Sequence, residues 1–213
     1  MKSYIMRFLL FLTFILLSLN ASTQAKECNC NKDSLINQST TDCKTILLKS
    51  GAKLYWQFNC NKIWLTLELK TGKKIIIDTV PIDYYGYTFR LGYHLFKEFA
   101  KSLLFRSGCP ANGPCNFVLL NKDNGKKLTE FGELIYDHET DAVYDFILYL
   151  SSRSTLTLHY IDSNKKYKIK IDSKQVNSVI PEYAFHKIFV NNKLLTLEYG
   201  NKKILLDLKK YSR

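Results

Sequence analysis

The chain has 213 residues, enough for one domain or at most two small ones. Apolar residues make up 46% of the sequence and charged residues 23%, which excludes a wholly disordered chain. The formal net charge is +12, but lysine supplies nearly all of the positive charge. Because arginine is the residue that usually reads bases and grips phosphates, we expect no nucleic-acid partner. Most of the lysines are better explained as solvated residues at turns. The alternative is that they attract the protein to an anionic surface.

Residues 1–25 have the pattern of a secretory signal peptide. Lys2 and Arg7 precede an apolar run from Phe8 to Leu19, and small residues around Ala25 suit cleavage. The alternative is a membrane anchor, but this run is shorter than the roughly 20 residues that a spanning helix needs. No later segment is long and apolar enough to span a membrane. We therefore expect a mature chain that begins near Lys26 and is exported to the periplasm or the extracellular space.

Six cysteines follow the expected cleavage site, where disulfides can form. Sequence alone allows 15 ways of pairing six cysteines. Cys109 and Cys115 enclose a short Pro- and Asn-Gly-containing loop, so we expect them to pair with each other. Cys28 and Cys30 are too close to bond together and should seek Cys43 and Cys60. A zinc site is the rival interpretation, but the spacing lacks two Cys-x-x-Cys pairs, so we expect no metal or other cofactor.

Residues 26–43 are polar and predict an irregular, cysteine-containing arm. From residue 44 to 213 the sequence predicts a single β-repeat domain of about four units. Each unit has an apolar strand, a lysine-flanked polar turn and a second strand, with another apolar run before them. The four turns fall at Gly72, Gly125, Asn164 and Asn201.

The repeat predicts an all-β fold of antiparallel hairpins, arranged as a four-bladed propeller-like ring. A β-sandwich built from the same hairpins is the alternative, because periodicity does not report closure. Residues 93–105 are ambiguous, since apolar pairs recur there every four residues as in an amphipathic helix. We favour strands in this segment because the repeat requires one shortly before Cys109.

An aromatic cluster is the best hint of a binding surface. It comprises Tyr84, Tyr85, Tyr87, Phe89 and Tyr93, next to Pro81 and Gly86. Aromatic rings on a loop can stack on sugars or anchor a protein partner. The alternative is that these rings fill the core between two units.

The segment from residue 137 to 145 holds a dense acidic patch with one histidine. Its carboxylates could bind calcium or support acid–base catalysis, but it lacks the glycine and spacing of a known calcium loop. A solvated turn is the simpler interpretation. The residues concerned are Asp137, His138, Glu139, Asp141 and Asp145.

These observations predict an exported, disulfide-stabilised protein that works by binding a protein or glycan at the cell envelope. We identify no catalytic residues in the sequence. The alternatives are a hydrolase that uses the acidic patch and a purely structural envelope component. The oligomeric state is not predicted.

Overall fold

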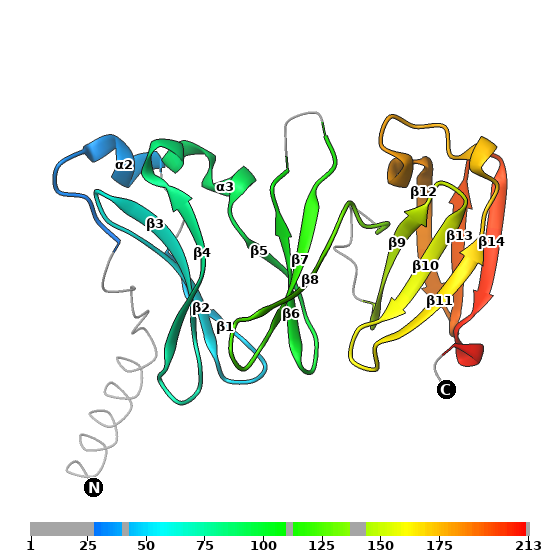
Figure 1. Cartoon of the computed structure of the whole chain (residues 1–213), viewed down its shortest axis with the longest axis horizontal. Coiled ribbons are helices and arrows are strands. Elements are labelled where there is room, and N and C mark those ends of the chain that lie inside the picture. The colour runs from blue at the N-terminus through cyan, green and yellow to red at the C-terminus, as the bar shows by residue number, and fades with distance from the viewer. Residues whose placement is uncertain (1–27, 40–42, 110–112, 137–143, 212–213) are drawn as a thin grey trace, which may run out of the picture.

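The structure is a computed structural model that describes residues 28–39, 43–109, 113–136 and 144–211. In these residues the chain folds into four small antiparallel sheets, which follow one another in chain order along the molecule (Figure 1). The all-β prediction is confirmed. The expected signal peptide, residues 1–25, lies outside the described residues.

The first two sheets have four strands each, in the orders β1-β2-β3-β4 and β5-β6-β7-β8. The first comprises β1 (Ile46–Leu47), β2 (Lys53–Phe58), β3 (Lys62–Glu68) and β4 (Lys74–Pro81). The second comprises β5 (His94–Glu98), β6 (Ser102–Ser107), β7 (Asn116–Asn121) and β8 (Lys127–Phe131).

The last two sheets are three-stranded meanders, with the orders β11-β10-β9 and β12-β13-β14. The third comprises β9 (Phe146–Ser152), β10 (Thr155–Tyr160) and β11 (Lys165–Lys170). The fourth comprises β12 (Phe185–Asn191), β13 (Leu194–Tyr199) and β14 (Lys202–Asp207).

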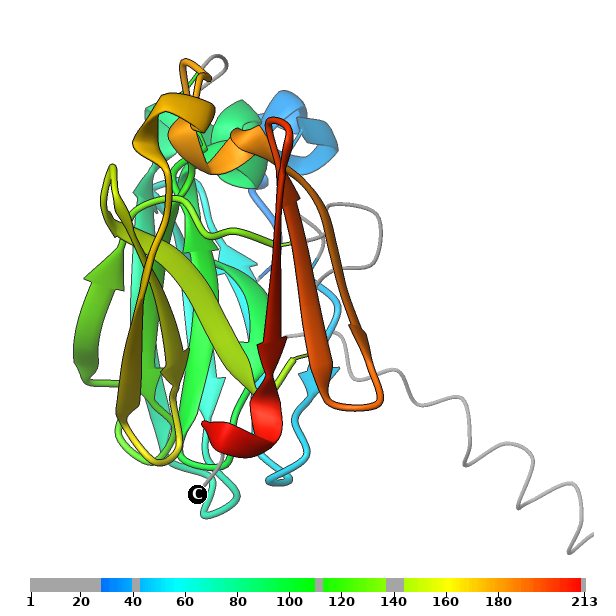
Figure 2. The same ribbon diagram turned by 90° about the vertical axis from the view of Figure 1, so that its right-hand side faces the viewer.

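Short helical segments lie between the sheets and at the two ends of the chain, and they gather mostly at one end of the molecule (Figure 2). The structure places one of them, α2, inside the segment expected to be an irregular arm. They are α2 (Ser34–Ser39), η1 (Ile82–Tyr87), α3 (Thr88–Leu91), η2 (Ser173–Gln175), η3 (Pro181–Ala184) and, at the opposite end, η4 (Leu208–Lys210).

All four predicted turns join neighbouring antiparallel strands: β3 to β4, β7 to β8, β10 to β11 and β13 to β14. Left-handed backbone explains the residue types at these turns. Gly72 and Gly125 have φ of 83° and 67°, and Asn164, a residue type that tolerates this region, has φ of 51°. At the fourth turn the left-handed residue is Gly200, with φ of 51°, and not the predicted Asn201. The unit of three or four strands that the repeat predicts is confirmed.

Residues 93–105 form the hairpin of β5 and β6, so the helix alternative is wrong. The helix-like pattern arises because this sheet is buried on both faces. Leu103 and Phe105 face the first sheet and Leu104 faces the other way, so consecutive positions are all apolar. A bulge between Leu95 and Lys97 shifts the alternation further.

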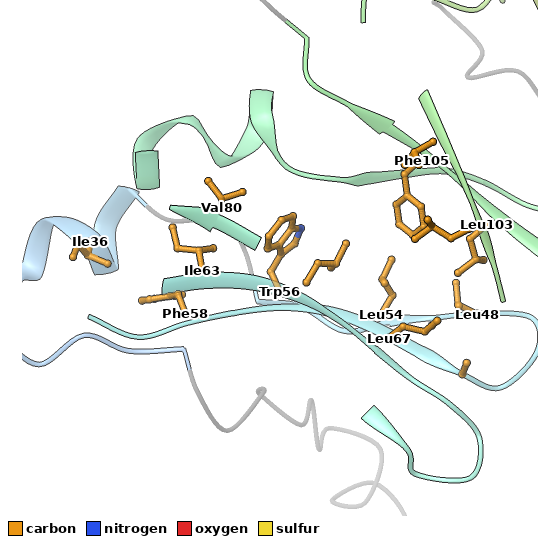
Figure 3. Close-up of a cluster of buried hydrophobic side chains, with 14 of the residues drawn as sticks. Ile36, Leu48, Leu54, Trp56, Phe58, Ile63, Leu67, Val80, Leu103 and Phe105 are labelled. Carbon is orange, nitrogen blue, oxygen red and sulfur yellow. The ribbon is translucent and has the colours of Figure 1, made fainter. Parts of the chain in front are cut away.

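Three hydrophobic clusters hold the sheets together in sequence. The first cluster joins the first and second sheets. Another joins the second and third sheets, and the remaining one joins the third and fourth sheets. Figure 3 shows the first cluster, in which Leu103 and Phe105 of β6 reach toward Leu54 and Leu67 of the first sheet. None of these clusters of described residues joins the first sheet to the fourth. The structure therefore shows no closed ring, and the propeller-like ring stays a prediction.

The cysteines form three disulfides, which agree with the predicted pairing. Cys28 bonds to Cys43, and Cys30 bonds to Cys60 in the turn between β2 and β3. The N-terminal segment is thereby tied to the first sheet. Cys109 and Cys115 close the loop between β6 and β7.

Carboxylates from one sheet also bind the turns of the sheet before it. Glu98 at the end of β5 accepts hydrogen bonds from the backbone N–H groups of Lys49, at 2.8 Å, and Ser50, at 3.3 Å. Glu98 forms an ion pair with Lys122, and both side chains are 9% exposed. Asp162 repeats this arrangement one sheet later, at the β5–β6 turn, where its oxygens accept from the N–H groups of residues 100 and 101.

Replacing Glu98 by glutamine should destabilise the fold by about 3 kcal/mol at pH 7, because it leaves the Lys122 ammonium buried without its counter-charge. The measurement is urea denaturation of the mature protein. Glu130→Gln is the matched control. Its ion pair with Lys127 is 53–57% exposed, and its loss should cost about 0.5 kcal/mol or less.

The pH dependence of the same variant provides a second test. Burial raises the pKa of Glu98, but hydrogen bonds from Lys122 and from the two N–H groups outweigh it and lower the pKa overall. A lowered pKa stabilises the fold above the unfolded-state pKa, and this stabilisation is lost as pH falls through the folded-state value. The difference between wild type and Glu98→Gln should therefore shrink in acid. A constant difference would contradict this assignment.

Candidate functional site

The structure divides the predicted aromatic cluster into two groups. Tyr84, Tyr87 and Phe89 are exposed, at 50%, 55% and 58%. Tyr85 and Tyr93 instead pack against the first hydrophobic cluster, and the ring of Tyr93 stacks on Phe105 with 5.7 Å between centroids. The binding and core interpretations therefore each apply to part of the cluster.

The division coincides with a kink in η1 at Tyr84, whose φ of −106° and ψ of 22° are not helical. Pro81 ends β4 with a fixed φ, and the chain then enters η1. Positions 82, 85 and 88 face the core: Ile82 and Tyr85 pack against it, and Thr88 is 2% exposed. The positions between them, including Tyr84 and Tyr87, are left to face solvent.

Two hydrogen bonds and a close contact anchor the C-terminal end of this segment. The N–H of Cys109, in the disulfide loop, donates to the carbonyl of Arg90 at 2.9 Å. The Asp78 carboxylate accepts from the N–H of Tyr93 at 2.8 Å. A Cβ at Gly92 would lie 2.6 Å from the Trp56 ring, so only glycine lets the chain pass this close to the core.

We define the aromatic surface as Tyr84, Tyr87, Phe89 and Leu91. Leu91 is 45% exposed, and the guanidinium of Arg90 lies 5.4 Å from the centroid of the Phe89 ring. All of these residues belong to η1 and α3, at the end of the molecule where most of the helical segments gather (Figure 2).

A second constellation, which the sequence did not predict, joins acids and tyrosines from distant segments. Glu133 follows β8 and is 2% exposed, and its Oε2 accepts from the N–H of Cys115 at 2.6 Å. The hydroxyl of Tyr183 in η3 donates to the same oxygen at 3.3 Å. Nothing in the sequence marks Glu133, because its partners come from loops far along the chain.

Electrostatics at this constellation disfavour further negative charge. Burial raises the pKa of Glu182, and the neighbouring charge of Glu133 raises it further. The pKa values of Tyr136 and Tyr183 are raised by burial and by Glu133 in the same way. The contacts tie the disulfide loop, the segment after β8 and η3 together, which is a structural role.

The predicted acidic patch is largely untested. Asp137, His138, Glu139 and Asp141 lie outside the described residues. Asp145 is described and exposed, at the start of the third sheet. Among the residues that the structure describes, no group of three or more His, Cys, Asp or Glu is arranged to hold a metal ion.

The division of the aromatic cluster predicts that substitutions at two neighbouring tyrosines differ in their effect on stability. Tyr85→Ala should lower the free energy of unfolding by about 2 kcal/mol, because it removes a ring packed on the core. Tyr84→Ala should change it by no more than about 0.5 kcal/mol. Chemical denaturation of both variants measures the difference, and equal losses would refute the division.

Glu182→Gln should raise the melting temperature at pH 7 by on the order of 2 °C. A carboxyl group whose pKa is raised on folding favours the folded state at low pH, and this advantage is lost as pH rises through the folded-state pKa. At pH 4 the variant and the wild type should therefore melt closer together. Glu130→Gln, on the exposed face of β8, is the control, and a gain that persists unchanged at pH 4 would refute the electrostatic cause.

Comparison with known proteins adds no family to these observations. No protein-family model matches the chain, and a search of curated proteins found no matching sequence. Among the described residues, no helix has the length and apolar character needed to cross a membrane.

Proposed function

We propose that this chain is an exported binding protein that attaches to a protein partner in the cell envelope through the aromatic surface. The observation that carries this proposal is the half-exposure of Tyr84, Tyr87 and Phe89 on a segment whose neighbours are locked into the core. Soluble proteins usually bury such rings or scatter them singly.

Rigidity supports a binding role for this segment. Association costs free energy for every side chain and loop that it must order. The C-terminal end of the segment is anchored by Asp78, by the loop of Cys109 and by the close approach of Gly92 to Trp56. A partner would therefore gain the contact area of the rings without having to order the chain beneath them.

The composition of the surface favours a protein over a glycan as the partner. Tyrosine, phenylalanine and arginine are enriched at the centres of protein interfaces and supply most hot spots. Leu91 adds an aliphatic side chain, which has no hydrogen bond to offer a sugar hydroxyl. Arg90 lies beside Phe89 and can donate to acidic or carbonyl groups of a partner.

The disulfides support an oxidising compartment. The described cysteines are all paired and none is free, which is typical of secreted and periplasmic proteins. Residues 1–25, which have the pattern of a signal peptide, would direct the chain to export from the cytoplasm. Periplasmic or extracellular location is thus part of the proposal.

Photo-cross-linking in the producing cell tests the proposal. A photoreactive phenylalanine analogue at position 87 or 89 should capture an envelope protein. The same analogue at position 128 should not, although Leu128 on β8 is 52% exposed. Adducts of equal yield and identity at all three positions would contradict a specific surface.

Affinity for the captured protein is then measured by calorimetry. The triple variant Tyr84→Ala/Tyr87→Ala/Phe89→Ala should bind at least about 100-fold more weakly, as expected for the loss of hot-spot residues. The variant Leu128→Ala/Leu205→Ala removes exposed apolar side chains elsewhere and should bind normally. Unchanged affinity of the triple variant would favour the purely structural alternative.

A further inference from the structure

A cavity of about 420 Å³ is lined by residues of the third and fourth sheets, including Leu208 of η4. η4 lies at the end of the molecule opposite η1 and α3, which carry the aromatic surface (Figure 2). This volume is within the range of pockets that hold small molecules. Of the residues that the structure describes, three aromatic, two aliphatic and two oppositely charged ones line the cavity. The aliphatic residues are Val190 and Leu208.

The aromatic wall is preformed. The rings of Tyr144 and Phe146 are parallel, with 5.3 Å between their centroids and 6° between their planes. The ring of Tyr160 meets Phe146 edge-on at 5.6 Å. Phe146 is 5% exposed, and the Tyr144 hydroxyl donates to the carbonyl of Ile188 in β12. The two sheets therefore fix the wall between them.

The charged residues come from opposite sides of the cavity: Asp145 from the start of the third sheet and Lys193 from the β12–β13 turn. Lys193 has a φ of 66° and Asn192 a φ of 47°, so this two-residue turn has left-handed backbone at both positions. Glycine is the preferred residue at the second position of such a turn. A lysine there costs stability, which points to a use for its side chain.

The lining selects among classes of ligand. A wholly apolar ligand would offer no hydrogen-bonding group to Asp145 and Lys193, which are both exposed, and so would make no use of them. An anion or a cation would meet one like charge. A neutral saccharide satisfies both residues, because its hydroxyls donate to a carboxylate and accept from an ammonium group. Its C–H faces can also lie against the rings, whereas a small zwitterion has little apolar surface with which to cover them.

We infer that this cavity binds a neutral saccharide, with Asp145 and Lys193 as its hydrogen-bonding residues and the rings of Tyr144, Phe146 and Tyr160 as its apolar wall. The inference is independent of the proposed protein partner, since the two surfaces lie at opposite ends of the molecule. Loss of one function should leave the other intact.

Saccharide binding is tested with the mature protein and a panel of neutral mono- and disaccharides, including glucose, N-acetylglucosamine and maltose. Saturation-transfer NMR detects binding and calorimetry measures the affinity. At least one saccharide should bind with a Kd of about 1 mM or tighter. No binding at about 10 mM of any of them would overturn the inference. So would exclusive binding of phenylalanine or of glycine, which represent aromatic and small zwitterionic ligands.

Lys193→Gly is the decisive variant, because glycine suits the left-handed backbone and should leave the melting temperature unchanged or higher. Loss of the ammonium group should weaken saccharide binding about tenfold, the value of one charge-assisted hydrogen bond. Asn192→Gly relaxes the same turn but keeps the ammonium group, so it should bind as the wild type does.

Asp145→Asn provides the matching test on the other side of the cavity and should also weaken binding about tenfold. Wild-type affinity in Lys193→Gly and Asp145→Asn together would overturn the inference. The aromatic-surface variant Tyr84→Ala/Tyr87→Ala/Phe89→Ala should bind the saccharide normally, and its failure to do so would show that the two surfaces are not independent.

Discussion

Each of the four sheets has an apolar face that only a neighbouring sheet can cover. Phe105 on β6 and Phe117 on β7 are both fully buried, but they face opposite ways, toward the first and the third sheet. The second sheet is thus a shared wall between two cores. Removal of any one sheet would expose the apolar face of the next. Because burial of one large side chain contributes roughly 1.5–3 kcal/mol to the stability of the fold, this exposure would be strongly destabilising.

Hydrophobic packing alone does not fix how one sheet is aligned along the next, and the polar contacts between sheets supply that information. Glu98 and Asp162 each bind two N–H groups at the tip of the preceding sheet, where those donors would otherwise have only water as a partner. The buried Lys122 then compensates the charge of Glu98. The same arrangement at two successive interfaces explains how short meanders with similar apolar faces can be held in a defined order.

The two ends of the molecule, at which the strands of the four sheets begin and end, differ in their chemistry. At one end lie most of the connections between sheets, which form short helices and carry the aromatic surface. At the other end lie the β12–β13 turn and η4, which contribute Lys193 and Leu208 to the cavity. The proposed protein-binding surface and the proposed saccharide site are thus assigned to different ends of the molecule.

The sequence by itself determined the strands and their turns, because period-two alternation and left-handed turn residues are local properties of the chain. It also pointed to the correct cysteine partners. It could not separate Tyr84 from Tyr85, since which of these rings meets the core depends on the kinked path that the chain takes after β4. It also missed Glu133 and Lys193, whose surroundings come from residues distant along the chain. Only the tertiary structure decided these points, because burial and charge compensation depend on the packing of one sheet against another.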